Sequence, residues 1–370
     1  MKRASLTVAA IIVALDASAP AFAQDNPAPT AQSGKLSMYW IDTEGGAATL
    51  IVSPSGESLL IDTGFPDADR DAKRIYSAVR QAGLNHIDHL VISHWHADHE
   101  GGLAAFAKMM PISKFYDHGD TASPEDQGRL DDYKAVAGNK RVIVKPGDKI
   151  PMKDLDVLVV TSDQKQIANP VNGGGPNPLC ANAPRMAPAA PENLRTVGLL
   201  LSYNKFTYLN LIDLDWYKDM ELACPINKVG KVTLYQTSRH GSFDDAGSPP
   251  FLGAIAPQVI VVNNGPRKGL GQTDARAKPI ADPQAAPYER NSYLRMAKLP
   301  GLESIWQQHL SLLDKDPNHN TAENMIANFE EKADCKGNWI SASVAPDGKF
   351  TVTNGRNGYS RNYAARPAGE

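Results

Sequence analysis

The sequence has few cysteines and no Cys-x-x-Cys pair. Its 370 residues include three cysteines, at positions 180, 224 and 335. In an oxidising compartment this number predicts one disulfide and one free thiol, and we expect Cys180 to pair with Cys224. No cysteine lies beside a candidate base in the sequence, which argues against a nucleophilic cysteine.

The chain also lacks a long hydrophobic run and a strong excess of charge. Lys and Arg number 38 against 41 Asp and Glu, a formal net charge of −3. Proteins that hold long nucleic acid normally carry a basic stripe, so this balance argues against a duplex partner and favours a small-molecule substrate. The apolar stretch at residues 8–15 is too short to cross a bilayer, and no later segment is long enough.

Residues 1–23 have the pattern of a signal peptide. Lys2 and Arg3 precede the apolar stretch, and Ala21-Phe22-Ala23 is a small-x-small cleavage site. We therefore expect an exported protein, most simply in a bacterial periplasm. Residues 24–34 are rich in Pro, Ala and Ser and predict a disordered lead-in to a folded region over residues 35–365. That length suffices for one large domain or two small ones.

Apolar periodicity predicts two strand-rich halves with helices between the strands. The expected strands are at residues 36–41, 47–52, 58–61, 87–93, 114–116, 141–144, 155–161, 197–202, 206–212, 231–236, 258–262, 304–306, 339–344 and 350–352, and the expected helices at 67–82, 103–110, 125–137, 216–223, 250–255 and 291–298. Two irregular segments, 169–192 and 265–287, interrupt the pattern. We expect the first to lie over the functional site as a long ordered loop. The whole predicts two sheets packed face to face with helices outside.

The densest group of reactive side chains is His94-Trp95-His96-Ala97-Asp98-His99, directly after the apolar run Leu90-Val91-Ile92. Neutral imidazole nitrogen and carboxylate oxygen are the ligands that zinc and similar cations prefer. Four such ligands are too many for one four-coordinate ion that keeps an open position, so the spacing predicts two ions. The alternative is a solvated turn that binds nothing.

Further motifs extend this group along the chain. In chain order they are Asp62-Thr63-Gly64, His94-x-His96-x-Asp98-His99-x-Gly101-Gly102, Asp213 after an apolar strand, and His240-Gly241-Ser242. Together they resemble the metallo-β-lactamase-fold hydrolases. The resemblance is closest to the branch that includes the metal-hydrolase domain of bacterial DNA-uptake competence proteins. That branch has Gly-Asp and His-His-Gly-Ser where this chain has Ile212-Asp213 and Arg239-His240-Gly241-Ser242.

This resemblance implies an α/β fold, an αββα sandwich with the site at one edge between two mixed sheets. It implies two divalent ions, most simply Zn²⁺, with Mn²⁺ or Fe as alternatives. The ligands carried over are His94 and His96 for the first ion, Asp98, His99 and His240 for the second, and Asp213 between them. Asp98 and Asp213 are the expected catalytic carboxylates. Asp62 resembles an aspartate that fixes the metal loop through hydrogen bonds.

Some positions depart from the family pattern or allow two interpretations. Many members have a histidine in a Pro-Gly-His turn where this chain has Ser162-Asp163-Gln164, and Asp163 or His118 are the candidates to replace it. His118 could line the site or be hydrogen-bonded at a turn. Arg239 and Ser242 could contact a substrate anion, although Arg239 could equally pair with a surface carboxylate. Asp215 is expected to cap the helix that begins near Trp216.

The predicted function is that of an exported dinuclear metal-dependent hydrolase that uses a metal-bound hydroxide. A small phosphodiester or phosphate ester is the expected substrate. Hydrolysis of a lactone, or of a cyclic amide in the manner of a β-lactamase, is the alternative. The competing hypothesis is a metal-binding or scaffold protein without activity, which would be expected to have lost some of these ligands.

Overall fold

The computed structural model describes residues 31, 34–188, 190–243, 245–332 and 335–366. The predicted signal peptide and most of the lead-in lie outside these residues. Within the part of the chain that is described, no helix is both long and apolar enough to cross a membrane.

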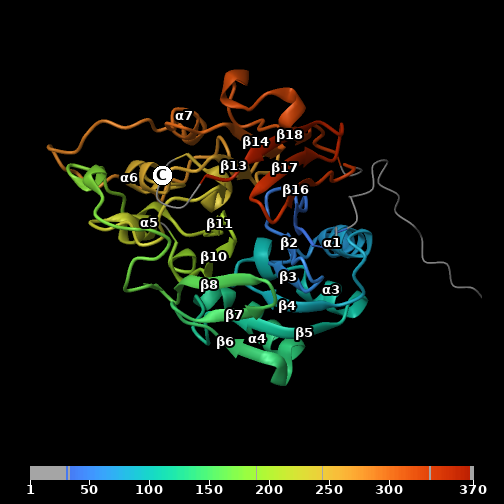
Figure 1. Cartoon of the computed structure of the whole chain (residues 1–370). Helices are drawn as coiled ribbons and strands as arrows, with labels where there is room; N and C mark the ends of the chain where they lie inside the picture. Colours follow the sequence, from blue (N-terminus) through green and yellow to red (C-terminus); the bar gives the residue numbers. More distant parts are fainter. Residues whose placement is uncertain (1–30, 32–33, 189, 244, 333–334, 367–370) are drawn as a thin grey trace, which may run out of the picture.

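Two nine-stranded sheets make up the centre of the molecule (Figure 1). The first sheet has the order β18-β17-β16-β1-β2-β3-β4-β5-β6, and the second has β15-β14-β13-β12-β11-β10-β8-β7, with β9 paired to β8. The strands of the first sheet are β1 (Leu36–Trp40), β2 (Thr49–Val52), β3 (Ser58–Ile61), β4 (Ile87–Val91), β5 (Ile112–Asp117), β6 (Arg141–Ile143), β16 (Ile340–Val344), β17 (Lys349–Asn354) and β18 (Ser360–Ala364). Those of the second are β7 (Lys149–Met152), β8 (Leu155–Ser162), β9 (Lys165–Gln166), β10 (Gly198–Tyr203), β11 (Phe206–Asn210), β12 (Leu234–Gln236), β13 (Val259–Val262), β14 (Ser304–His309) and β15 (Ile326–Asn328).

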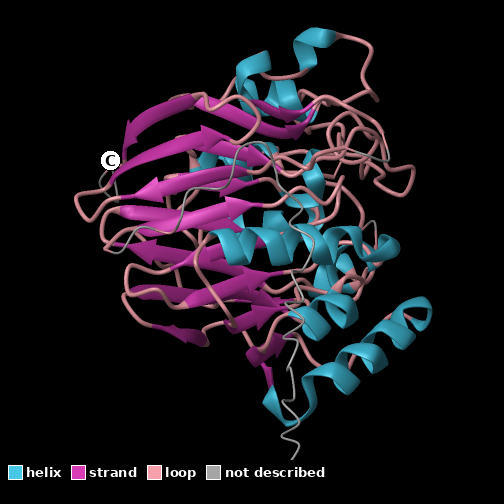
Figure 2. Cartoon of the chain, turned by 90° about the vertical axis from the view of Figure 1, so that its right-hand side faces the viewer, coloured by secondary structure: helices cyan, strands magenta, loops and turns pink. Residues whose placement is uncertain are grey.

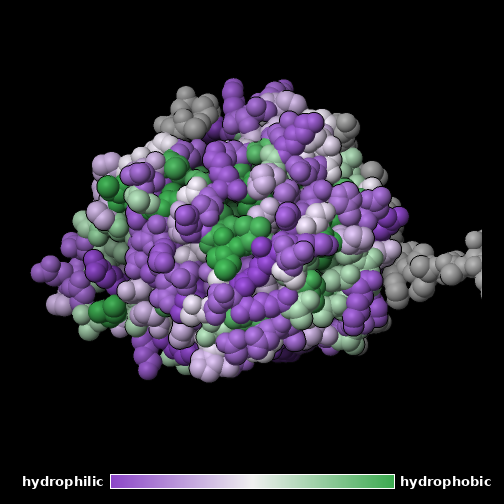
Figure 3. Space-filling view, turned by 90° about the horizontal axis from the view of Figure 1, so that it is seen from below, coloured by the Kyte–Doolittle hydropathy of each residue, from purple (hydrophilic) through white to green (hydrophobic). Residues whose placement is uncertain are grey.

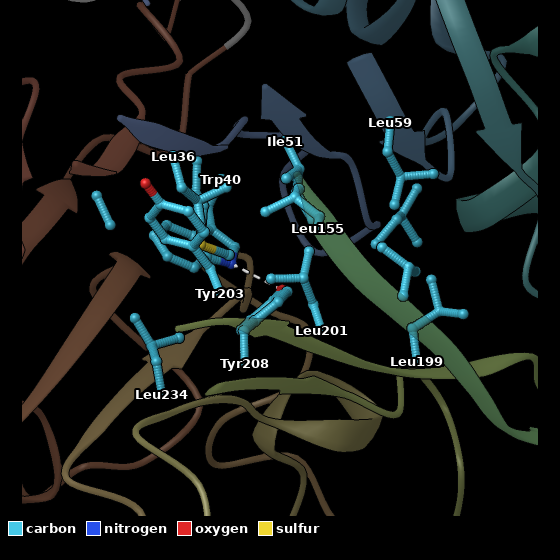
Figure 4. Packing of buried hydrophobic residues seen from close by; sticks show 14 of the residues in the cluster. Leu36, Trp40, Ile51, Leu59, Leu155, Leu199, Leu201, Tyr203, Tyr208 and Leu234 are labelled. Carbon is cyan, nitrogen blue, oxygen red and sulfur yellow. Dashed lines mark hydrogen bonds between the residues drawn. The ribbon is translucent and has the colours of Figure 1, made fainter. Parts of the chain in front are cut away.

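Side-chain alternation along the strands explains how the sheets pack. In β1, Leu36, Met38 and Trp40 enter the core between the sheets, whereas Tyr39 joins the cluster on the outer face. In β10, Leu199 and Leu201 face the first sheet and Leu200 faces outward. Figure 4 shows these inner side chains meeting across the interface. The sheets are therefore held together by apolar side chains removed from water, which is the main favourable contribution to folding.

Helices cover both outer faces (Figures 1 and 2). They are α1 (Arg70–Gln81), α2 (Ala97–Glu100), α3 (Leu103–Met109), α4 (Gln127–Ala137), α5 (Trp216–Ala223), α6 (Pro249–Ile255) and α7 (Ser292–Ala297). The outer cluster of the first sheet takes residues from α1, α3 and α4. That of the second sheet takes them from α5, α6 and α7. The predicted αββα sandwich is thus confirmed.

The strands that the sequence did not predict include three at sheet edges. β18 ends the first sheet, and β7 and β15 end the second. β7 and β18 leave alternate positions in solvent, and β15 has only three residues. Edge strands need no continuous apolar run, so the periodicity that reveals central strands is weak in them. The opposite edge of the first sheet, β6, exposes Ile143 by 52%. The face seen from below in Figure 1, where β6 and α4 lie, is otherwise mainly hydrophilic (Figure 3).

The irregular segment 169–192 packs beside α5 and α6. A disulfide joins Cys180 to Cys224 at the end of α5, as predicted, and leaves Cys335 as a buried free thiol. Asn177 donates hydrogen bonds to carbonyl oxygens of Ala223 and Pro250. The segment therefore covers the outside of the second sheet.

We expect the disulfide to contribute to stability by limiting the unfolded chain. Its cysteines are 44 residues apart in sequence, and loops of this length correspond to about 2–4 kcal/mol in unfolding free energy. The double variant Cys180→Ser/Cys224→Ser should lose this amount in a denaturant titration. Reductant should have no further effect on that variant, whereas it should destabilise the unmodified protein. Equal stability of the two proteins would show that the cross-link contributes nothing.

Candidate metal centre

The predicted metal ligands meet where parallel strands of both sheets end. β3 and β4 are parallel neighbours in the first sheet, and β11, β12 and β13 in the second. The loops after β3 and β4 carry Asp62 and the histidine motif. Asp213 follows β11, and His240 lies in the short 3-10 segment Ser238–Gly241 after β12. The carboxyl ends of parallel strands are a common place for binding sites, because their loops converge there.

Asp62 fixes the metal loop from beneath. Its Oδ1 accepts the backbone N–H of Ser93, and its Oδ2 accepts from the Ser93 hydroxyl, both at 2.8 Å. The same Oδ2 lies 2.8 Å from Nδ1 of His99, so that Nε2 of the ring faces the site. Asp62 is fully buried and adopts a left-handed φ of 61°. This placement agrees with the loop-fixing role that the resemblance implied.

Four ligand atoms converge in what we call the His99–His240 half-site, made of Asp98, His99, Asp213 and His240. Nε2 of His99 and Nε2 of His240 each lie 3.1 Å from Oδ2 of Asp98. They lie 3.5 and 3.2 Å from Oδ1 of Asp213. Ligands bound tetrahedrally at zinc-like distances would be about 3.4 Å apart.

Two atoms of this half-site have no hydrogen-bond partner. They are Nε2 of His99 and Oδ1 of Asp213, both buried. Leaving a buried polar atom without a partner normally costs free energy, unless a ligand or ion satisfies it. The donor types, their spacing and the unpaired atoms all fit a divalent cation.

A second cluster, the His94–His96 half-site, comprises His94, His96 and the shared Asp213. Nε2 of His94 and Nδ1 of His96 are 2.9 Å apart. Nδ1 of His94 is hydrogen-bonded to the Ser93 hydroxyl at 3.0 Å, which leaves its Nε2 directed at the cluster. The other nitrogen of His96 faces Asp126 at 3.9 Å. These donors also fit a divalent ion, although the half-site has one protein ligand fewer.

The electrostatics prepare the ligands for a cation. Burial, together with the neighbouring rings of His99 and His96, holds the pKa of His94 well below its usual range, so its lone pair is free. Burial opposes charge on His99, but the carboxylates of Asp98, Asp213 and Asp62 raise its pKa well above the usual range. The extra proton on His99 partly balances two anionic carboxylates, and a metal ion would replace it.

Lys268 is a site residue that sequence analysis missed. Its ammonium contacts Oδ2 of Asp98 and lies 4.9 Å from the ring centre of Phe65. Although burial opposes ionisation of Asp98, Lys268 and His99 hold its pKa well below the usual range. Lys268 approaches because Gly269, with φ of 84°, packs against His240: a Cβ there would lie 2.2 Å from the His240 carbonyl oxygen. The sequence signal for Lys268 would have been a lysine between two nearby glycines, Gly265 and Gly269, which is a weak indication of a site residue.

Segment 265–287 contributes walls of a polar pocket of about 220 Å³ above these ligands. The lining residues are His96, Asp98, Asp213, Arg239, His240, Ser242, Lys268, Gln272, Asp274 and Arg276. None of them belongs to segment 169–192, so the expectation that this segment lies over the site is wrong. Segment 169–192 approaches the metal loop at its last residue, Glu192, which accepts a hydrogen bond from the backbone N–H of Trp95. The physical reason is the packing of the segment against α5 and α6, which composition alone did not show.

The remaining predicted residues divide between site and scaffold. Nε2 of His118 pairs with Glu192 at 3.0 Å, and its ring packs on Trp95. Asp163 pairs with Arg195. Neither His118 nor Asp163 belongs to a metal-capable cluster of the described residues. Asp215 caps α5, accepting from Lys218 N at 3.1 Å, as expected.

Arg239 and Ser242 both border the pocket. The Ser242 hydroxyl donates to Asp245. Arg239 is almost fully enclosed and pairs with three carboxylates, those of Asp213, Asp245 and Asp274. Arg239 is therefore a partner of carboxylates, but two of the three, Asp213 and Asp245, are buried in the structure and do not lie on the surface as expected.

Two amides also contact the histidines of the site. Nδ1 of His240 lies 3.0 Å from the side-chain amide nitrogen of Asn263, at the end of β13. Asn193, in the segment Asn193–Arg195, is fully buried between His96 and Arg239. With the side-chain amide in the orientation that satisfies both neighbours, its nitrogen donates to Nδ1 of His96 at 2.9 Å and its oxygen accepts from Nη1 of Arg239 at 2.7 Å. Asn193 begins Asn193-Leu194-Arg195-Thr196, which resembles the Asn-x-x-Ser-type lead into a strand in the competence-protein branch, whereas Asn263 lies in no such motif. The contacts of both amides are visible only in the tertiary structure.

Comparison with known proteins agrees with this geometry. Residues 41–181, which include the histidine motif, match the family model of the metallo-beta-lactamase superfamily. The match supports this superfamily for the chain. An atrochrysone carboxyl ACP thioesterase of Cryptosporiopsis sp. (strain 8999) is 32% identical over 109 residues, 28% of this chain and 32% of that protein. A lactamase-like protein of Aspergillus sp. (strain MF297-2) is 29% identical over 108 residues, with the same coverage.

The chain thus spans about a third of the length of these relatives. Among solved structures, the metallo-beta-lactamase fold protein YhfI from Bacillus subtilis aligns with 62% of this chain and 87% of its own, at 9% identity and a TM-score of 0.38.

Asp62→Asn should weaken metal binding by about 10–100-fold, the range typical of partners that orient metal ligands. The amide keeps the size of the side chain but removes the charge that holds Nδ1–H of His99. The measurement is competition with a chromogenic chelator. Asp88→Asn is the matched control, because Asp88 also accepts two hydrogen bonds from a neighbouring strand but lies away from the centre. Equal affinities for Asp62→Asn and the unmodified protein would contradict the role of Asp62.

Proposed function

We propose that this protein is a metal-dependent hydrolase that acts on a small phosphodiester or phosphate ester. The observation that carries the proposal is the His99–His240 half-site, where four buried ligand atoms converge and two lack partners. The neighbouring His94–His96 half-site supplies ligands for a second ion. Zn²⁺ is our first choice because imidazole and carboxylate suit it, and Mn²⁺ or Fe would use the same donors.

When bound, divalent ions would supply Lewis-acid activation of water and of the bond to be cleaved. The chain's own residues do the rest. His94, His96, His99 and His240 direct ring nitrogens to the centre, and Asp98 and Asp213 provide its negative charge. Asp98 and Asp213 are also the proposed catalytic carboxylates, because Oδ2 of Asp98 and Oδ1 of Asp213 both face the point where the histidines meet.

The charges around the pocket favour an anionic substrate. Lys268, Arg239 and Arg276 line it together with Ser242 and Gln272. Arg239 is occupied by three carboxylates, whereas Lys268 has Asp98 as its carboxylate partner. If Asp98 serves as a metal ligand, the Lys268 ammonium would no longer be needed to balance its charge and could bind a phosphate oxygen. The motifs Ile212-Asp213 and Arg239-His240-Gly241-Ser242 add the resemblance to the competence-protein branch as support.

Hydrolysis of a thioester, lactone or cyclic amide is the second candidate. The observation that favours it is the sequence relation to a protein named as a thioesterase and to one named as lactamase-like. For a substrate of this kind that carries a carboxylate, Lys268 would supply the same charged hydrogen bond as for a phosphate oxygen. We also propose export to an oxidising compartment, which the Cys180–Cys224 disulfide and the residue pattern of the first 23 positions support.

Asp213→Ala should abolish hydrolysis, whereas Asp215→Ala should retain most of it. Asp213 holds both half-sites together, but loss of the Asp215 helix cap costs only about 1 kcal/mol. The assay uses metal-loaded protein with a chromogenic aryl phosphodiester, a lactone and a cephalosporin, alongside metal analysis. Loss of activity in Asp215→Ala with retention in Asp213→Ala would refute the assignment. Turnover of only the lactone or cephalosporin would select the second candidate, and no turnover by any metal-loaded form would argue against a hydrolase.

Lys268→Ala should raise KM for an anionic substrate by roughly 10–100-fold, as expected for loss of one hydrogen bond to a charged group. Lys278→Ala is the matched control, since Lys278 lies in the same segment, is exposed and does not line the pocket. KM for a neutral ester should change little in either variant. An unchanged KM for the anionic substrate in Lys268→Ala would exclude this contact.

A further inference from the structure

The two half-sites differ in what their ligands already contact. In the His99–His240 half-site, Nε2 of His99 and Oδ1 of Asp213 have no hydrogen-bond partner. Two basic side chains reach these ligands from outside the cluster. The Lys268 ammonium contacts Asp98 and is 31% exposed, and Arg239 donates to Oδ2 of Asp213 but leaves Oδ1, the atom that faces His99 and His240, without a partner. An incoming cation can displace that ammonium into the solvent at little cost. This half-site therefore offers four ligand atoms that are ready to bind.

The His94–His96 half-site is occupied by fixed partners. Nη1 of Arg239 donates to Oδ2 of Asp213 at 2.9 Å. The N–H of Asn193 donates to Nδ1 of His96, which is the nitrogen that faces His94. An ion that bound here would have to remove the amide from His96 and share Asp213 with a guanidinium. It would also have only two imidazoles of its own.

Arg239 cannot easily leave or lose its charge. Its Nε donates to Asp245 at 2.8 Å, and its Nη2 donates to Asp274 at 3.2 Å. A guanidinium keeps its proton under all ordinary conditions, and here the surrounding carboxylates raise its pKa further although burial opposes this. In a buried site the repulsion between this charge and a nearby cation is poorly screened.

The backbone is bent to bring this cation to the centre. Arg239 and its neighbour His240 both have left-handed conformations, with φ of 51° and 53°. Such conformations are unfavourable for residues with a Cβ and are retained mainly where function requires them. Here they place a metal ligand and a permanent cation side by side, one at each half-site.

We propose that the two half-sites bind divalent ions with unequal affinity and that Arg239 sets the difference. The His99–His240 half-site fills first, and the His94–His96 half-site fills only at higher metal concentration. The proposal rests on the proposed function in one respect, namely that the cluster holds divalent ions at all. Arg239 is thus a positioning residue that acts through Asp213 and Asn193.

The test is a metal titration of the full chain after removal of metals with a chelator. Calorimetry with Zn²⁺ and with Mn²⁺ gives the affinities, and elemental analysis after dialysis gives the stoichiometry. The unmodified protein should retain about one ion tightly and bind a second at least tenfold more weakly. His94→Ala should abolish the weaker metal binding, and His240→Ala should abolish the tighter metal binding. Two ions of equal affinity would overturn the proposal, whereas no binding at all would overturn the proposed function instead.

Variants at Arg239 test the cause. Arg239→Gln removes the positive charge and should strengthen binding at the weaker half-site at least tenfold. It should change binding at the tighter half-site less, because Oδ1 of Asp213 faces that half-site and does not contact Arg239. Arg239→Lys keeps the charge and should leave the weaker binding weak. Arg276→Gln is the matched control, because Arg276 also pairs with Asp274 but does not contact Asp213. Near-ultraviolet circular dichroism establishes folding. If Arg239→Gln folds but binds metal at the weaker half-site no more tightly than the unmodified protein, the charge of Arg239 is not the cause. If Arg239→Gln does not fold, Arg239→Lys is the deciding variant. Tighter binding at the weaker half-site in Arg239→Lys, which keeps the charge, would likewise show that the charge is not the cause.

Discussion

Buried negative charge is the constraint on which the rest of this site depends. Asp62, Asp98 and Asp213 are all removed from solvent within one small region. A buried carboxylate is tolerated only when positive charge or hydrogen-bond donors surround it. Here the balancing groups come from three separate stretches of chain, namely the histidine motif, the segment with Arg239 and His240, and the loop with Lys268. The loops of both sheets therefore meet at the candidate metal centre.

The same charge balance explains why the loops have strained conformations. Asp62, Ile212, Arg239 and His240 all have positive φ values although none is glycine. Each lies on the turn that leaves a strand at the site, so the strand ends are bent to aim side chains inward. The burial of apolar side chains between the sheets offsets the free energy of these conformations. In the same core, Trp40 donates hydrogen bonds to Tyr208 and Gln236. A rigid sandwich thus supports a strained site.

The sequence predicted the parts of this protein that carry a regular pattern. Central strands such as β4 and β10 have apolar runs, and the His94–His99 motif has a spacing that few other sites share. The pairing of Cys180 with Cys224 and the cap at Asp215 were likewise predicted correctly. The contacts of Lys268, Asn193 and Asn263 were not, because they arise where irregular segments approach the site from far along the chain. The sequence made His118 a possible ligand, but its Nε2 is hydrogen-bonded to Glu192, which lies far along the chain.

The arrangement of the ligands has a consequence for folding. Asp98 and His240 are 142 residues apart, and they come from loops of different sheets. The second sheet is formed by β7 to β15, so it is inserted between strands of the first, which β16 to β18 complete. Long-range contacts form late, because closing long loops costs entropy before any contact repays it. The ligand cluster can therefore be complete only after the two sheets have docked, so the candidate metal centre depends on the whole sandwich and not on either sheet alone.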